Sequence, residues 1–134
     1  MILYINGQDI KRLALGSLAV GADPGIDPVI FETDPDDYLA VIADYLKSID
    51  RTLEDLDALA AVIGPGSPTA LRASLAIANT LAFARRLPTL PLEKPAEVDD
   101  HEFIKTIDLG TLEERAQTLK PIYLRPPNIT FSNK

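Results

Sequence analysis

The chain has 134 residues, enough for one domain with a core of ordinary size but too few for two full domains with a cleft between them. Its composition is 46% hydrophobic and 25% charged, and no apolar run approaches the length of a membrane span. A net charge of −7 argues against nucleic-acid binding by this chain alone, because phosphate recognition uses clustered Lys and Arg. The sequence contains no cysteine, so we expect no disulfide. Lys11 and Arg12 follow the first apolar residues instead of preceding them, so we expect no signal peptide and a cytoplasmic, non-membrane protein.

The N-terminal part of the chain predicts three short strands. Residues 1–6 predict a short apolar strand, and the Asn6-Gly7 dipeptide at its end is typical of a β-hairpin turn. The second strand is expected over residues 10–20. A loop rich in Gly and Pro then leads to a third strand at residues 29–32.

A first helix is predicted from Pro35 to Ile49. Asp34 stands at the N-cap position, and the two acidic residues after Pro35 suit the positive end of the helix dipole. The apolar side chains along one line of this helix are Tyr38, Ile42, Tyr45 and Ile49.

The centre of the sequence, residues 57–92, predicts a strand, a turn, a long helix and another strand. Ala58 to Ile63 is an unbroken apolar run, as in a strand covered on both faces. The turn is Gly64-Pro65-Gly66-Ser67, in which the Ser67 hydroxyl can cap a helix that runs to Arg86. Residues 87–92 return as a strand, so this βαβ unit predicts two parallel strands.

The predicted order βββαβαβ favours an α/β fold with a five-stranded mixed sheet in the order 3-2-1-4-5. This is one subdomain of the actin, sugar kinase and Hsp70 type (ASKHA) fold, which we assign to residues 1–95. Residues 96–134 are expected to form a short C-terminal extension. It comprises an extended piece at 103–109, a helix that begins with the capping box Thr111 to Glu114 and ends before Pro121, and a loosely ordered tail.

The second helix has little polar surface, because only Arg72, Asn79 and Arg86, seven residues apart, make a polar stripe on it. A helix of this kind needs a covering surface besides the sheet, either another helix of the chain or a partner protein. We therefore predict a partner interface on the two helices. Arg72 is either an anchor of that interface or a structural residue that holds the glycine turn. The predicted interface residues are Tyr38, Ile42, Tyr45, Ile49, Ala70, Arg72, Ser74, Ile77 and Leu81.

Two other segments could carry chemistry. Gly64-Pro65-Gly66-Ser67 lies at a helix N-terminus and could bind phosphate, but no Walker A lysine follows, and a tight structural turn is the favoured interpretation. His101 lies among Asp99, Asp100 and Glu102, where a solvated histidine is favoured over a metal ligand. The sequence predicts no catalytic residue, cofactor or metal.

Residues 53–82 resemble the TsaB (YeaZ) family of bacterial proteins required to make threonylcarbamoyladenosine in tRNA. The family signature is close to GPGSFTGLR, and residues 64–72 read GPGSPTALR, which matches at seven of nine positions. Pro121-Ile122-Tyr123-Leu124-Arg125 is similar to the P-x-Y-L-R near the end of many members. Two features depart from the family. Asn6-Gly7-Gln8 replaces the usual Asp-Thr-Ser, and some 25 residues stand in place of a second subdomain, so we expect a shortened form.

The resemblance implies a non-catalytic scaffold that binds TsaD through its two N-terminal helices, with the TsaE ATPase joining the pair. TsaD transfers the threonylcarbamoyl group to adenosine 37 of tRNA. In nucleotide-binding relatives of this fold, an Asp in the first hairpin takes part in binding metal and phosphate. Asn6 cannot supply the negative charge of that carboxylate. Two alternatives stay open at this stage: a nucleotide- or phosphate-binding enzyme of the ASKHA type, and a homodimer formed through the same helices.

Overall fold

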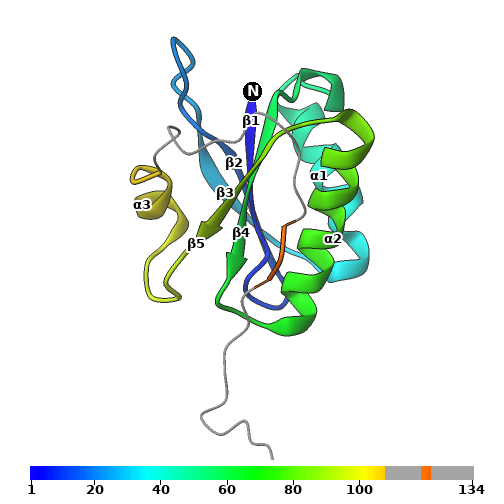
Figure 1. Ribbon diagram of the computed structural model, residues 1–134, viewed down its shortest axis with the longest axis vertical. Helices are drawn as coiled ribbons and strands as arrows, with labels where there is room; N and C mark the ends of the chain where they lie inside the picture. The colour runs from blue at the N-terminus through cyan, green and yellow to red at the C-terminus, as the bar shows by residue number, and fades with distance from the viewer. Residues whose placement is uncertain (108–118, 122–134) are drawn as a thin grey trace, which may run out of the picture.

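The computed structural model describes residues 1–107 and 119–121. The described chain follows the predicted order of strands and helices and adds one short helix after the last strand (Figure 1). Two single 3-10 turns, Pro35–Asp37 and Leu53–Asp55, flank the first α-helix. The elements are β1 (Ile2–Asn6), β2 (Arg12–Ser17), β3 (Ile26–Glu32), α1 (Tyr38–Ser48), β4 (Ala58–Gly64), α2 (Pro68–Arg85), β5 (Thr89–Glu93) and α3 (Asp100–Ile104).

The five strands form one mixed sheet in the order β3-β2-β1-β4-β5, which confirms the predicted fold class and strand order. Strand β1 pairs antiparallel with β2 and parallel with β4, and β4 pairs parallel with β5. The parallel pairing of β1 with β4 sets Leu3 opposite Leu59. Hairpin β1–β2 and the turn between β4 and α2 therefore lie at the same end of the sheet (Figure 1).

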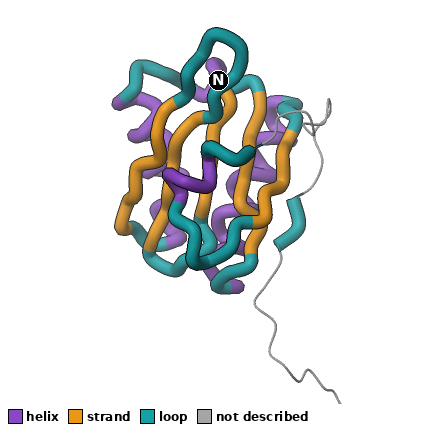
Figure 2. The backbone as a smooth tube through the Cα atoms, turned by 90° about the vertical axis from the view of Figure 1, so that its left-hand side faces the viewer, coloured by secondary structure: helices purple, strands orange, loops and turns teal. Residues whose placement is uncertain are grey.

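Both faces of the sheet are covered, which explains why β1 and β4 are apolar without alternation. Helices α1 and α2 lie on one face, and the short helix α3 crosses the other (Figure 2). Alternate residues of a strand point to opposite faces. Leu3 and Leu59 accordingly join the core beneath α1 and α2, whereas Tyr4 and Ala60 join the core beneath Phe103 of α3.

Two helix starts show how capping works in this chain. The predicted helix from Pro35 begins as a 3-10 turn, and Asp34 stands at its N-cap with extended backbone but without a side-chain cap hydrogen bond. The α-helical part then begins at Tyr38. At α2, the Ser67 hydroxyl accepts a hydrogen bond from the backbone N–H of Ala70, as predicted, and Pro68 takes the first turn.

Strand boundaries differ from the sequence prediction where the chain turns. Strand β2 begins at Arg12 because Lys11 has a positive φ of 62° and belongs to the hairpin turn. Strand β3 begins at Ile26, earlier than predicted, and includes Pro28, which an edge strand tolerates because one side of its backbone needs no ladder partner.

The region after β5 corrects one prediction. Residues 103–104, expected to be extended, belong to helix α3, whose N-cap Asp99 accepts a hydrogen bond from the backbone N–H of Glu102. The predicted helix from Thr111 and the C-terminal tail lie outside the described residues. No helix in residues 1–107 combines the length and hydropathy that a bilayer crossing would need.

Residues 119–121 lie beside α2 (Figure 1). The Asn79 side chain donates to the carbonyl of Leu119 at 3.1 Å and accepts from its N–H at 2.7 Å. Leu119 is buried in the core on the helix side of the sheet. Asn79, predicted as part of a polar stripe, thus holds a distant piece of the chain against α2.

Candidate functional site

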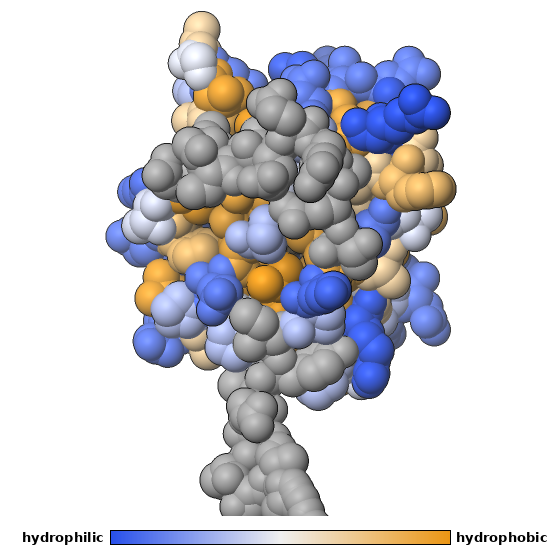
Figure 3. All heavy atoms as spheres, in the orientation of Figure 1, coloured by the Kyte–Doolittle hydropathy of each residue, from blue (hydrophilic) through white to orange (hydrophobic). Residues whose placement is uncertain are grey.

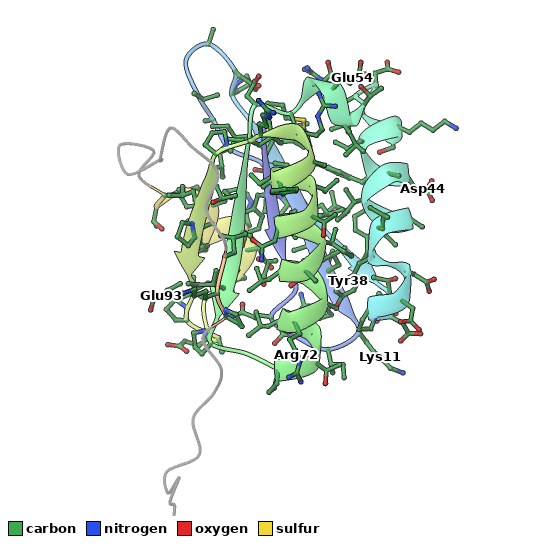
Figure 4. All side chains as sticks on the ribbon, turned by 45° about the vertical axis from the view of Figure 1, so that its right-hand side comes forward. Lys11, Tyr38, Asp44, Glu54, Arg72 and Glu93 are labelled. Carbon is green, nitrogen blue, oxygen red and sulfur yellow. The ribbon has the colours of Figure 1, made fainter. Side chains whose placement is uncertain are left out.

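Most of the predicted interface residues lie in the core of the chain. Six of the nine are buried, because they face the sheet or the seam between the helices: Tyr38, Ile42, Tyr45, Ala70, Ser74 and Leu81. Figure 4 shows Tyr38 on the side of α1 that faces α2 and the sheet, whereas Asp44 points away from the molecule. In this fold these six side chains pack against their own chain and offer no surface to a partner.

The other three predicted residues reach the surface to different extents. Ile49 and Ile77 are half-buried and pack against the core on the helix side. Arg72 is exposed near the N-terminal end of α2 (Figure 4).

The outward side of the two helices, here called the helix-pair surface, combines small residues with two large apolar side chains. Leu39 of α1 is 52% exposed and Phe83 of α2 is 85% exposed. Figure 3 shows apolar side chains at the surface among hydrophilic ones on the right-hand side, where α1 and α2 lie. The helix-pair surface consists of Leu39, Ala40 and Ala43 on α1 and Arg72, Ala76, Thr80 and Phe83 on α2, all exposed.

A second candidate site, here called the polar cluster, lies where β1 and β5 end, beneath α3. It is formed by Tyr4, Asn6, Gln8, Lys94 and Asp100, all less than a tenth exposed. One carboxylate oxygen of Asp100 accepts hydrogen bonds from the Tyr4 hydroxyl and the Asn6 amide, both at 2.6 Å. These bonds tie the first residue of α3 to β1.

Burial raises the pKa of the Tyr4 phenol, and the hydrogen bond and charge of Asp100 raise it further. The phenol therefore stays protonated and keeps donating to Asp100 over the physiological pH range.

Lys94 and Gln8 form the other half of the polar cluster. The Lys94 ammonium donates to the side-chain oxygen of Gln8 at 2.9 Å and to the carbonyl of Pro95 at 3.2 Å. The Gln8 amide donates to the carbonyls of Pro65 and Lys94 at 2.7 and 3.0 Å. Gln8 thus links the first hairpin, the glycine turn and the end of β5.

Hairpin β1–β2 packs directly on the start of α2. A Cβ on Gly66 would lie 2.4 Å from the carbonyl oxygen of Gln8, and one on Gly7 would lie 2.5 Å from Cβ of Ser74. The backbone N–H of Ser67 donates to Gln8 O at 2.8 Å. The glycines are therefore needed for close approach between these segments, which agrees with a structural turn at residues 64–67.

Among residues 1–107 and 119–121, no three His, Cys, Asp or Glu side chains converge in a way that could hold a metal ion. His101 is half exposed, and its Nδ1 lies 3.6 Å from a carboxylate oxygen of Asp27. Sequence reasoning missed the polar cluster. The signal for it is a polar residue soon after an apolar strand: Gln8 lies two residues after the end of β1, and Lys94 directly follows β5.

Comparisons with known proteins connect this fold to two related groups. A family model described as TsaD, tRNA N6-adenosine threonylcarbamoyltransferase, matches residues 36–95, which include α1, β4, α2 and β5. The tRNA N6-adenosine threonylcarbamoyltransferase of Geobacter sulfurreducens is 45% identical over 49 residues, covering 37% of this chain and 14% of that protein.

Among solved structures, YeaZ from Pseudomonas aeruginosa aligns with a TM-score of 0.58 and 20% identity over 69% of this chain. The chain is YeaZ-like in fold. A second structure, described as an uncharacterized protein with similarity to peptidase YeaZ from Pseudomonas aeruginosa, aligns with a TM-score of 0.59, also at 20% identity over 69% of this chain. The resemblance to the TsaB (YeaZ) family is thus confirmed in the fold. The chain spans 43% and 42% of the lengths of these two structures.

Proposed function

We propose that this YeaZ-like chain works in tRNA threonylcarbamoylation as a non-catalytic subunit. In this proposal it binds a TsaD-like protein through the helix-pair surface and supports the transfer of the threonylcarbamoyl group to adenosine 37 of tRNA. A TsaE-like ATPase joins the pair. The observation that carries the proposal is the exposure of Leu39 and Phe83 on helices that belong to a YeaZ-like fold.

The helix-pair surface has the composition of a docking site. Large apolar side chains that are buried on association supply most of the energy of an interface, and aromatic residues are enriched there. The small exposed residues Ala40 and Ala43 of α1 and Ala76 of α2 allow the helices of a partner to approach closely. Phe83 is 85% exposed, so its ring buries little surface against the described part of the chain and is available to a partner.

The polar cluster supports a non-catalytic role. Its side chains form hydrogen bonds with one another and with backbone carbonyls, and Asn6 brings no charge to the first hairpin. A catalytic centre of this fold would need groups directed at a substrate instead.

The proposal is tested by mixing the purified chain with the TsaD-like protein of the same organism. We expect a complex on gel filtration at micromolar concentration, and we expect Phe83→Asp to weaken it by at least tenfold in a calorimetric titration. Val20→Asp is the matched control, because Val20 is also an exposed apolar residue, 41% exposed, but lies in the loop after β2. Absence of a complex, or equal affinity of the two variants, refutes the proposal.

A second candidate is a nucleotide- or phosphate-binding enzyme of the ASKHA type. It is favoured by the match of residues 36–95 to the transferase family and by the glycine turn before α2. Titration of the chain with ATP and magnesium discriminates the two, since saturable binding at submillimolar concentration supports the enzyme. Gel filtration of the chain alone tests the third possibility, a homodimer formed through the same helices, because a dimer elutes at twice the mass of the chain.

A further inference from the structure

A groove opens at the C-terminal ends of α1 and α2, next to the helix-pair surface. It measures about 670 Å³ and is lined by Ala43, Leu46, Lys47, Arg51, Thr52, Leu53, Glu54 and Arg85. Leu46 is buried at its base, Leu53 is half-buried, and the other lining residues are exposed. Glu54 lies at the upper end of the molecule, where α1 ends (Figure 4). The groove therefore has an apolar floor and a polar rim.

The rim carries three cations and one carboxylate, in a protein whose net charge is −7. Lys47, Arg51 and Arg85 form no ion pair with any carboxylate of residues 1–107 and 119–121. Cations without a carboxylate partner in the described part of the chain attract opposite charge from outside it and favour encounter with an acidic surface. The charge of the groove is thus opposite to that of the chain as a whole.

We infer that this groove receives an apolar side chain flanked by carboxylates, carried by the protein that docks on the helix-pair surface. The inference rests on the proposed function and adds the chemistry of the contact. Ala43 belongs to both the groove and the helix-pair surface, so one partner can cover the two together. The apolar floor takes the aliphatic or aromatic side chain, and the two arginines pair with carboxylates in bidentate geometry.

An apolar floor distinguishes this occupant from nucleic acid. Phosphate backbones are held by cations and polar groups, and they offer no apolar contact to the half-buried Leu53 or the exposed Ala43 of the groove. An acidic protein segment uses the cations and the floor at once. We therefore assign an acidic protein segment to the groove, in preference to nucleic acid.

The test compares two charge reversals in the complex with the TsaD-like protein. Arg51→Glu should raise the Kd at least tenfold in 50 mM salt and make the affinity less sensitive to added salt. Lys105→Glu, which reverses an exposed cation next to α3 on the opposite side of the sheet, should change the Kd less than twofold. Equal effects of the two variants overturn the inference while leaving the proposed function intact, because the complex itself still forms.

A second experiment needs no partner protein. It therefore tests the chemistry of the groove separately from the proposed binding to a TsaD-like protein. A hexapeptide of alternating Glu and Leu is titrated into the isotopically labelled chain and followed by NMR. We expect shifts at the amides of Leu53 and Arg85, and we expect them to be lost in Arg51→Glu. Absence of shifts at these amides overturns the inference, and so do larger shifts there with bulk tRNA than with the peptide.

Discussion

Replacement of Tyr45 by Phe should stabilise the protein. Tyr45 is 4% exposed on the inner side of α1, and its hydroxyl has no hydrogen-bond partner among the described residues. Its ring makes an edge contact with Phe31, with centroids 6.0 Å apart and an interplanar angle of 78°. Tyr45→Phe removes the unpaired hydroxyl and keeps the ring, so the contact with Phe31 is retained.

The size of the effect follows from the cost of burying a polar group without a partner, which is about 1–3 kcal/mol. Phenylalanine avoids this cost and leaves at most a space the size of one oxygen atom. We therefore expect the free energy of unfolding to rise by about 1–2 kcal/mol. For a domain of this length, each kcal/mol corresponds to a rise in Tm of roughly 3–5 °C.

The assay is urea unfolding at pH 7, followed by circular dichroism, with the m-value as a check that the unfolded state is unchanged. Tyr4→Phe is the matched control, because it removes the same atom where the hydroxyl donates to Asp100 at 2.6 Å. We expect that variant to lose about 1.5–3 kcal/mol, the range for hydrogen bonds to charged groups. A Tyr45→Phe variant that is no more stable than the natural chain, at equal m-value, refutes the reasoning.

Two further predictions concern stability. Burial raises the pKa of Tyr4, Tyr38 and Tyr45, so the stability linked to their protons is fully present below the ordinary pKa near 10 and is lost as the pH rises above it. Urea unfolding between pH 8 and 11.5 should show a decline above pH 10 of up to about 1.4 kcal/mol per pH unit for each tyrosine. A Tyr4→Phe variant should decline less steeply, and identical slopes contradict the assignment. Gly7→Ala should destabilise by about 1–3 kcal/mol, because the new Cβ would lie 2.5 Å from Cβ of Ser74. Thermal unfolding of the pair Gly7→Ala and Ser74→Gly checks the cause, since the second substitution should recover part of the loss, and no recovery speaks against this contact.

The order of elements follows from local features of the sequence. The pattern of residues 1–6 predicts a strand, the apolar run at residues 58–63 predicts a buried strand, and Ser67-Pro68 predicts the start of α2. The structure confirms all three. The sheet order then follows from short connections and parallel crossovers, which leave few arrangements. Each of these signals lies within a few residues of the feature that it predicts, so no long-range contact is needed to recognise it.

The face that α2 buries could not be predicted in the same way. Apolar or small residues surround most of its circumference, so the helical pattern does not distinguish Leu81, which is buried, from Phe83, which is exposed. The choice depends on how α2 meets β4 and α1. On α1 the most apolar line of residues was assigned to the interface and proved to be the buried one. The predicted interface therefore fell largely on the core, and Leu39 and Phe83 were not among its residues.

The chain by itself determined the five strands, helices α1 and α2, and the order of these elements, because hydrophobic runs, capping residues and turn residues act over short distances. Only the tertiary structure decided which polar side chains form hydrogen bonds with one another. Asp100 meets Tyr4 and Asn6, and Lys94 meets Gln8, across more than 80 positions of sequence. The physical reason is that such pairs form only when the folded sheet brings the ends of β1 and β5 and the start of α3 together, and no local pattern encodes that approach.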